Sequence, residues 1–351
     1  MIGGGPEHLW QLVRHLPIEM QCFIAAPSCE PYGERFLQCV GQSNFLSIPQ
    51  RKFTLTAFGK LLHFIKKHNI QIIHSHGKGA GIYGRLAALF TGTKSIHTFH
   101  GIHLPSNRFV RMLYSVLEQV LCRISKVCIA VSDGEAKEAK KLKFGKNIIT
   151  IYNGVQIPEH MVQKDMQRPF KILHVSRFDT KQKNSLFLYD IALAMQKKDI
   201  LTQCQFILVG DGEELPILKD KLRNAQLLKY FTFAGIQKDV TPFYKEASCL
   251  ISTSRWEGLP LAVLEAGTYG VPTIASNVVG NRDAVVHGKT GFLYELGDVD
   301  GAVGCVEKLL DNIYRWKEMR IKTYIHIGDS FSVQRMAKTA IQEYNKITPS
   351  S

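Results

Sequence analysis

Residues 249–267 read CLISTSRWEGLPLAVLEAG, and this stretch predicts a buried strand, then a loop, then a helix. The run CLIST has the continuous apolar character of a strand inside a sheet, and Pro260 can occupy the first turn of the helix that follows. We therefore expect Glu257 on the loop at the carboxyl end of the strand and Glu265 inside the helix.

This strand–loop–helix unit is suited to bind an anion. The backbone N–H groups at Gly258, Leu259 and the start of the helix lack partners within the helix, and a helix N-terminus attracts negative charge. Gly258 also lets a ligand approach the backbone closely. One glutamate can accept the hydroxyls of a sugar and the other those of a ribose, with a diphosphate between them. The alternative is an exposed loop acid and a helix acid that is satisfied by capping.

Apolar runs typical of strands alternate with helical patterns along the chain, which predicts parallel sheets with crossover helices. The expected strands lie near 22–26, 45–49, 70–74, 94–99, 126–131 and 147–151, and then near 170–175, 205–209, 230–233, 249–253, 271–275 and 290–294. The polar segment between the two series contains prolines and is typical of a linker. The predicted organisation is a first domain at 1–152, a linker at 153–169, a second domain at 170–330 and a final helix within 331–351.

The segment EGLPLAVLEAG (257–267) resembles the Glu-x7-Glu signature of the retaining glycosyltransferases of family 4, which have the GT-B fold. Other segments extend the resemblance over almost the whole chain, in nearly the family's order. They are HSHGKGAG (74–81), HTFHGIH (97–103), VSDGEAK (131–137), IYNGV (151–155), HVSRFDTKQKN (174–184), LVGDGEE (208–214), FAGIQKDV (233–240) and NVVGNRDAVVHGKTGFLY (277–294). The resemblance implies two Rossmann-like domains that face each other across a cleft, with the final helix crossing back to the first domain.

The resemblance also implies catalytic roles. Arg177 lies just beyond the first strand of the second domain, and its planar guanidinium suits a diphosphate. The family places a lysine several residues later, which can be Lys181 or Lys183, and we favour Lys183. Glu257 would reach the reacting sugar, and His100 would lie near the same sugar and bond a hydroxyl or the developing positive charge.

Further contacts to the donor are expected from backbone groups and loops. The segment GGGPEHL (3–9) resembles the family's glycine-rich loop, in which the amides of Gly4 and Gly5 approach the donor phosphate. Asp211, in the GDGEE loop, would line the nucleotide pocket, and Gly280 would offer a backbone contact on the sugar side. Gly258, Leu259 and Glu265 complete the expected substrate-binding set.

One strand of the resembled fold is missing from this sequence. In the family an apolar strand precedes the glycine-rich loop, whereas here only two residues precede Gly3. A strand usually needs about 5–6 residues, and the first strand of a doubly wound sheet lies in its middle. We therefore expect a first sheet with two unpaired inner edges, and a chain that is shortened relative to a fully active form.

Composition and charge limit the possible functions. The chain of 351 residues has a net charge of +14, and the stretch from Arg35 to Leu117 holds eleven Lys and Arg but no acidic residue. Such a surface attracts anionic lipid headgroups or a polyanionic acceptor, whereas no pattern typical of a nucleic-acid-binding protein is present. The eight cysteines are scattered, as in a protein of the reducing cytosol, and no apolar run is long enough to cross a bilayer. The expected location is the cytoplasm, with peripheral contact to the inner face of the cytoplasmic membrane.

The acid-free stretch favours a retaining reaction. An inverting transferase needs a general base to take the acceptor proton, and between Glu34 and Glu118 only histidines could serve. In a retaining reaction the leaving phosphate itself can accept that proton. We also expect cations and backbone donors, in place of a metal ion, to stabilise the departing diphosphate.

The sequence thus predicts a metal-independent, retaining glycosyltransferase without a cofactor. A UDP- or GDP-sugar would be its co-substrate, and a cell-envelope glycan or lipid-linked glycan its acceptor. A sugar-nucleotide 2-epimerase of the same fold is one alternative, although it would require acid and base carboxylates. A non-catalytic nucleotide-sugar-binding partner of another transferase is the other.

Overall fold

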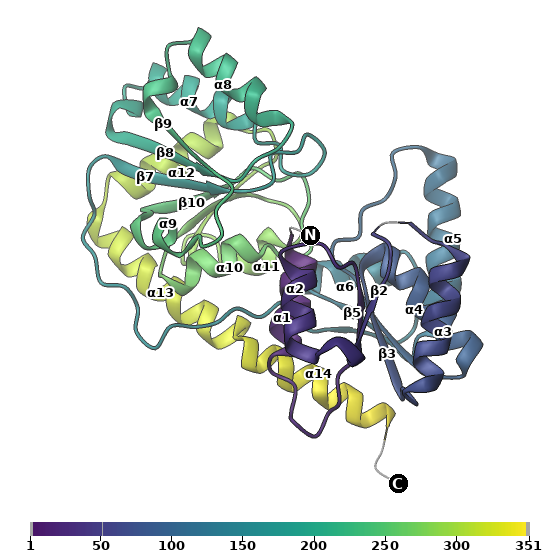
Figure 1. The fold of residues 1–351 in the computed structure, drawn as a ribbon. Coiled ribbons are helices and arrows are strands. Elements are labelled where there is room, and N and C mark those ends of the chain that lie inside the picture. Colours follow the sequence, from purple (N-terminus) through teal and green to yellow (C-terminus); the bar gives the residue numbers. More distant parts are fainter. Residues whose placement is uncertain (1–2, 51, 349–351) are drawn as a thin grey trace. The chain divides into compact units, whose positions relative to one another are not determined.

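The computed structural model describes residues 3–50 and 52–348. The chain forms two compact units: the first runs to Gly154 and takes in the chain from Val333 onward, and the second is Val155–Ser332 (Figure 1). The segment 155–169, expected to be a linker, belongs to the second unit. Arg320 holds it there, because its guanidinium donates to the carbonyl oxygens of Val162 at 2.6 Å and Lys164 at 3.2 Å.

The second unit is built on a six-stranded parallel sheet with the order β9-β8-β7-β10-β11-β12. Its strands are β7 (Phe170–Val175), β8 (Cys204–Val209), β9 (Phe231–Gly235), β10 (Cys249–Ser252), β11 (Thr273–Ser276) and β12 (Gly291–Tyr294). This is the doubly wound order, in which strands are added first on one side of the first strand and then, from the fourth strand on, on its other side. The first and fourth strands are β7 and β10, which pair with Leu173 opposite Leu250.

Helices cover this sheet and bury its apolar side chains. They are α7 (Phe187–Lys197), α8 (Glu214–Asn224), α9 (Thr241–Glu246), α10 (Leu261–Thr268), α11 (Asn281–Ala284), α12 (Val299–Leu310) and α13 (Ile313–Phe331), with short 3-10 turns at Leu201–Gln203 and Leu228–Tyr230. Phe170, Phe206 and Trp316 are fully buried in the main cluster of this core. The strands are continuous apolar runs because both faces of a parallel sheet are covered.

The described strands of the first unit form two separate parallel sheets. One pairs β1 (Ile24–Ala26) with β2 (Phe45–Ser47), and the other has the order β3 (Ile72–His76), β4 (Lys94–Thr98), β5 (Val127–Ala130), β6 (Ile148–Thr150). The division falls between β1 and β3. Among the described residues, no strand pairs with β1 on one side and β3 on the other. The fold is therefore α/β with two parallel-sheet units, as the sequence predicts.

The helices of the first unit are α1 (Gly4–Val13), α2 (Tyr32–Val40), α3 (Leu55–Lys67), α4 (Gly77–Thr91), α5 (Arg108–Ile124), α6 (Asp133–Lys141) and α14 (Val333–Ile347), with a 3-10 turn at Gln42–Asn44. The final helix, α14, belongs to this unit. Its Val333 and Met336 pack with Leu12 of α1 and with Ile96 and Ile129 of the four-stranded sheet.

The amino-terminal glycines differ from the expectation of a glycine-rich loop. Gly3 has φ 144° and lies just before α1, and Gly4 and Gly5 form the first turn of that helix. Glycine weakens a helix by only about 1 kcal/mol. Burial of Leu12 and Val13 on the same helix offsets that loss, since burying such side chains contributes about 1.5–3 kcal/mol each.

Candidate active site

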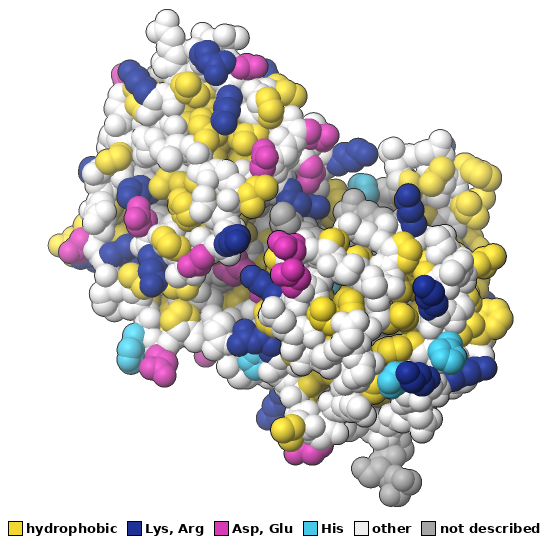
Figure 2. All heavy atoms as spheres, viewed as in Figure 1, with side chains coloured by type: hydrophobic (Ala, Val, Ile, Leu, Met, Phe, Trp, Pro, Cys, Tyr) yellow, Lys and Arg dark blue, Asp and Glu magenta, His cyan; other side chains and the backbone are white. Residues whose placement is uncertain are grey.

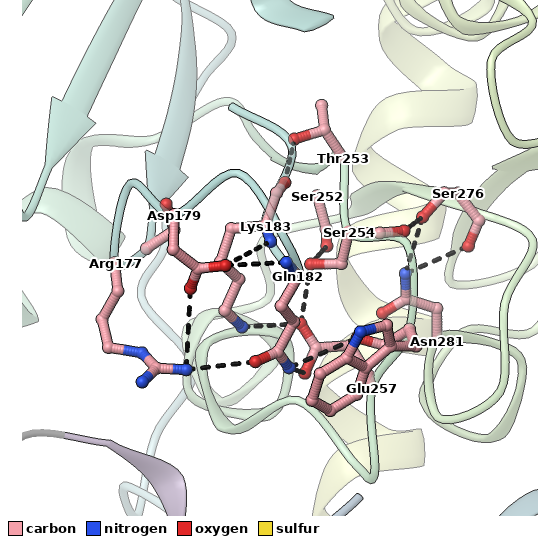
Figure 3. Close-up of polar contacts among 12 residues, drawn as sticks. Arg177, Asp179, Gln182, Lys183, Ser252, Thr253, Ser254, Glu257, Ser276 and Asn281 are labelled. Carbon is pink, nitrogen blue, oxygen red and sulfur yellow. Dashed lines mark hydrogen bonds and ion pairs between the residues drawn. The ribbon is translucent and has the colours of Figure 1, made fainter. Parts of the chain in front are cut away.

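The candidate donor site lies at the carboxyl ends of β7 and β10. The loop after β7 carries Arg177 and Lys183, and the loop after β10 carries Ser254 and Glu257 (Figure 3). In a doubly wound sheet, ligands bind outside the strand ends at the point where the strand order reverses. The sheet of the second unit reverses between these two strands, so its topology brings the two segments together.

Glu257 is buried and surrounded by donors. Its side chain is 7% exposed, and Lys183 Nζ donates to its Oε1 at 2.6 Å. Ser254 Oγ donates to the same oxygen at 2.7 Å, and Gln182 Nε2 donates to Oε2 at 3.1 Å. A buried carboxylate needs such compensation, and these bonds fix the direction in which it points. The expectation that Glu257 lies on the loop after the strand is confirmed.

Arg177 is held beside this carboxylate by the loop after β7. Its Nη2 donates to Gln182 Oε1 at 3.1 Å and lies 3.7 Å from Asp179 Oδ2 (Figure 3). Asp179 in turn accepts from the backbone amides of Gln182 at 2.7 Å and Lys183 at 3.3 Å. The arginine side chain remains 45% exposed. The loop therefore presents one accessible guanidinium and one lysine that is already paired.

The loop also distinguishes the two candidate lysines. Lys183 contacts Glu257, whereas Lys181 is exposed. Thr253 Oγ1 donates to the carbonyl oxygen of Lys183 at 2.8 Å, which ties the two loops together. The geometry thus favours Lys183 as the lysine of the donor site.

Gly280 closes the other side of the Glu257 loop. It has φ 84°, and a β-carbon at this position would lie 2.6 Å from Gly258 O and 2.9 Å from Glu257 Cβ. Only glycine fits a contact so close at such a backbone angle. The next residue, Asn281, donates from Nδ2 to the carbonyl oxygen of Ser276 at 3.0 Å. Gly280 therefore supports the loop that carries the catalytic candidate, while Leu259 is buried beside it.

Glu265 lies inside α10, as expected, and is half-buried. Tyr244 Oη donates to its Oε2 at 2.7 Å, and the buried Tyr244 therefore orients this carboxylate.

Two further positions near the site are Pro260 and Asp211. Pro260 lies one residue before α10, as its N-cap, and not in the first turn of the helix. Asp211 is exposed on the loop after β8, where its carboxylate accepts from the amide of Gly212 at 2.8 Å.

His100 lies in the first unit, just beyond β4. Its Nε2 lies 3.2 Å from Nδ1 of His76, and a β-carbon on Gly5 would lie 3.7 Å from its ring. Burial, together with repulsion from His8 and His74, lowers the pKa of His100 well below the ordinary value. The ring is therefore neutral near pH 7. The next residue is anchored by Glu135, whose Oε1 accepts from the amide of Gly101 at 2.6 Å.

An Asp-x-Asp pair occurs in the chain at Asp298 and Asp300, where it begins a helix. Asp298 is the N-cap of α12, and its Oδ1 accepts from the amide of Gly301 at 2.9 Å. The Asp-x-Asp spacing here serves a helix cap.

Three residues of this cluster do not appear among the sequence-predicted site residues: Asp179, Gln182 and Ser254. They connect Arg177, Lys183 and Glu257 by the bonds described above. No motif in the sequence singles them out. Gln182 bridges the arginine and the glutamate, because it accepts from Arg177 and donates to Glu257.

The second unit thus has a doubly wound sheet whose switch point presents a guanidinium, a lysine and an oriented carboxylate. Such an arrangement suits a bound diphosphate, because it places positive charge and a helix N-terminus at one end of the sheet. Both units match known protein families. Residues 2–157 match the model described as Glycosyltransferase Family 4, and residues 169–312 match that of Glycosyl transferases group 1.

Individual relatives extend this agreement. The chain is 30% identical over 270 residues to an Escherichia coli protein named UDP-Gal:alpha-D-GlcNAc-diphosphoundecaprenol alpha-1,3-galactosyltransferase, covering 72% of this chain and 69% of the relative. It is also 30% identical over 277 residues to the O-antigen biosynthesis glycosyltransferase WbnH of Escherichia coli, covering 76% and 75%. The protein belongs to glycosyltransferase family 4 and is a GT-B glycosyltransferase.

The fold is also that of solved structures. The Anabaena protein Alr3699/HepE, crystallised in complex with UDP, has a TM-score of 0.81 at 17% identity, with 98% of this chain and 96% of that chain covered. Within the described ranges, the helices of this chain include none with the length and apolar character needed to cross a membrane.

Proposed function

We propose that the protein is a retaining, metal-independent glycosyltransferase. It transfers a sugar from a nucleotide-sugar donor to a glycan or lipid-linked acceptor of the cell envelope. The observation that carries this proposal is the cluster at the carboxyl ends of β7 and β10, where Arg177, Lys183 and Glu257 meet.

The charges of this cluster suit a departing nucleoside diphosphate. Arg177 and Lys183 supply two positive charges, and α10 begins only four residues after Glu257, so its first amides add partial positive charge. When the diphosphate binds, Lys183 can bond both the phosphate and Glu257, since an ammonium group has three donors. Glu257, oriented by Ser254 and Gln182, then accepts hydroxyls of the transferred sugar. No metal ion is required in this scheme.

The state of His100 supports a retaining mechanism. A general base works best when its pKa lies near the working pH, and desolvation lowers the pKa of the half-buried His100 well below its ordinary value. The neighbouring Glu135 is 1% exposed, and it accepts from the backbone amides of Gly101 and Val131. We therefore assign the acceptor proton to the leaving phosphate, and His100 to a hydrogen bond with a hydroxyl of the transferred sugar.

The names of relatives support the choice of donor and acceptor. The Escherichia coli galactosyltransferase is named for UDP-Gal as donor and for a diphosphoundecaprenol-linked sugar as acceptor. We propose a UDP-sugar and a lipid-linked envelope glycan for this chain also. The alternatives from the sequence are less well supported, because an epimerase needs acid and base carboxylates and a mere binding partner has no need of an oriented Glu257.

A membrane contact fits this acceptor. Helix α5 is held against α4 by an ion pair between its buried Glu118 and Arg85 of α4, at 2.8 Å. Its other side exposes an apolar stripe at helical spacing, formed by Phe109, Val110, Met112, Leu113, Val116, Leu117 and Val120. Figure 2 shows hydrophobic side chains, with lysines and arginines among them, over the region that Figure 1 labels α5. We propose that this stripe rests in the inner face of the cytoplasmic membrane.

The test begins with a thermal-shift panel of sugar nucleotides, followed by transfer to a lipid-linked acceptor. We expect a UDP-sugar to raise the melting temperature and to be consumed. Proton NMR of the product should show the anomeric configuration of the donor, and a chelator should not lower the rate. An inverted linkage would contradict the retaining mechanism, and loss of activity in the chelator would contradict metal independence. Donor binding without hydrolysis or transfer would indicate a binding partner.

A further inference from the structure

Five histidines of the first unit lie close together, and two of them have clear structural roles. His74 bonds Tyr344 Oη through Nδ1 and Thr98 Oγ1 through Nε2, at 2.7 Å each. His97 is 1% exposed, and its Nδ1 lies 3.0 Å from Ser75 Oγ. The other three, His8 on α1, His76 at the end of β3 and His100 after β4, converge on one point.

These three rings have the spacing of a metal site. One ring nitrogen of each lies within 4.8 Å of a ring nitrogen of the other two. The closest pair, His76 Nδ1 and His100 Nε2, is 3.2 Å apart. Two nitrogens bound to one zinc ion at ~2.0–2.1 Å in tetrahedral geometry lie about 3.3 Å apart. One side of the triangle therefore already has the required length, and side-chain rotation has to bring His8 closer.

The hydrogen bonds of these rings are incomplete. Nδ1 of His8 and Nε2 of His76 are buried, and neither has a hydrogen-bond partner within the part of the chain that the structure describes. His8 itself is only 3% exposed. Buried polar atoms are nearly always bonded, so the unpartnered Nδ1 of His8, beside two further imidazoles, indicates a missing ligand. Neutral imidazole is the form that binds metal ions.

We propose that His8, His76 and His100 bind a divalent transition-metal ion of the zinc type. Three imidazoles would leave a fourth coordination position open to water or an anion. Zn²⁺, Co²⁺ and Ni²⁺ suit such an all-nitrogen site, whereas Mg²⁺ and Ca²⁺ prefer oxygen ligands.

The bound metal would inhibit transfer, an effect that rests on the proposed function. In that proposal His100 bonds a hydroxyl of the transferred sugar, and it cannot do so while its ring nitrogen coordinates a metal ion. Metal binding would thus inhibit a transferase whose reaction itself needs no metal ion. A chelator would restore the inhibited enzyme and leave the metal-free enzyme unchanged.

Cobalt binding tests the site without reference to activity. Co²⁺ takes similar ligands to Zn²⁺, and its visible absorption reports tetrahedral coordination. The full chain, carrying no histidine tag, is titrated with Co²⁺ alone. We expect one ion per chain, displaced by Zn²⁺. His8→Gln and His76→Gln should each weaken binding by about 100-fold or more, because loss of even an outer-shell partner weakens metal binding about 10–100-fold. His63→Gln, on the exposed face of α3, is the matched control.

The outcomes separate the site from the proposed function. No Co²⁺ binding by the wild-type chain, or equal binding by wild type and both cluster variants, would overturn the metal site. Melting temperatures identify a variant that fails to fold, and the remaining cluster variant then decides. Stoichiometric binding that leaves the transfer rate unchanged would uphold the site and overturn the role of His100 in transfer.

Discussion

Glu257 and Glu265 come from neighbouring parts of the chain, but their surroundings differ. Glu257 is buried among Lys183, Ser254 and Gln182, whereas Glu265 is half-buried on α10 and bonded by Tyr244. Glu265→Ala should weaken binding of the nucleoside diphosphate about 10–100-fold, since a charged hydrogen bond contributes about 1.5–3 kcal/mol. Glu257→Ala should instead slow transfer by about 10²–10³, as loss of one group that stabilises the transition state does. Calorimetry with UDP and turnover assays measure the two effects; equal loss of UDP affinity in both variants would contradict this division.

The two lysines of the loop after β7 provide a matched pair. Lys183 contacts Glu257, and Lys181 is exposed two residues away. Lys183→Gln should weaken UDP binding about tenfold or more and leave uridine binding nearly unchanged, because only the phosphates meet the ammonium group. Lys181→Gln should bind both as the wild type does. If uridine affinity falls as much as UDP affinity in Lys183→Gln, the lysine supports the loop and does not bind phosphate.

At the scale of elements, alanine substitutions at Gly280 and Gly288 distinguish backbone strain from a steric clash with the loop that carries Glu257. Both have positive φ, at 84° and 74°, so alanine strains either backbone by about 1–2 kcal/mol. A β-carbon on Gly288 would meet nothing within 4 Å, whereas one on Gly280 would press on Gly258 and Glu257. Gly288→Ala should therefore lower the melting temperature and keep activity. Gly280→Ala should lower both, with transfer slowed about tenfold or more by misplacement of Glu257. Full activity of Gly280→Ala would show that the loop after β10 tolerates displacement.

The elements themselves were largely predictable, and the reason is burial. The strand expected at 170–175 is β7 at Phe170–Val175, and the one expected at 249–253 is β10 at Cys249–Ser252. Strands covered on both faces are continuous apolar runs, so their positions are visible in the sequence. Gly4 and Gly5 were expected in a loop but lie in the first turn of α1, because packing of the rest of this helix outweighs the low helix propensity of glycine.

The polar contacts of the site were less predictable than its elements. Motif spacing places Glu257 and Arg177 near the ends of two strands. The bridge between them depends on how the loop after β7 folds, so Gln182 and Asp179 could be identified only in three dimensions. Motif spacing can also suggest a site where there is a structural role. Asp298 and Asp300 have the spacing of a metal-binding pair, but Asp298 caps α12.

At the scale of the whole molecule, charge is unevenly distributed along the chain. The first 160 residues contain 19 Lys and Arg against 9 Asp and Glu, whereas the remaining residues contain 25 against 21. The exposed apolar stripe of α5 lies in this basic part, and Arg108 and Arg111 belong to the same helix. A basic surface draws a protein to anionic lipid, and apolar side chains then enter the interface.

This combination predicts salt-sensitive binding to anionic vesicles through α5. Each Lys or Arg near an anionic surface contributes about 1 kcal/mol, and salt screens that attraction within a Debye length. Burial of an apolar side chain adds about 1.5–3 kcal/mol, so the double substitution Phe109→Ser and Leu113→Ser should weaken adsorption more than tenfold. Ile236→Ser, at an exposed apolar position of the second unit, should have no effect. Co-sedimentation measures all three proteins at low and high salt. Adsorption that is equally strong on neutral vesicles, or unchanged in the α5 variant, would show that this helix does not contact the membrane.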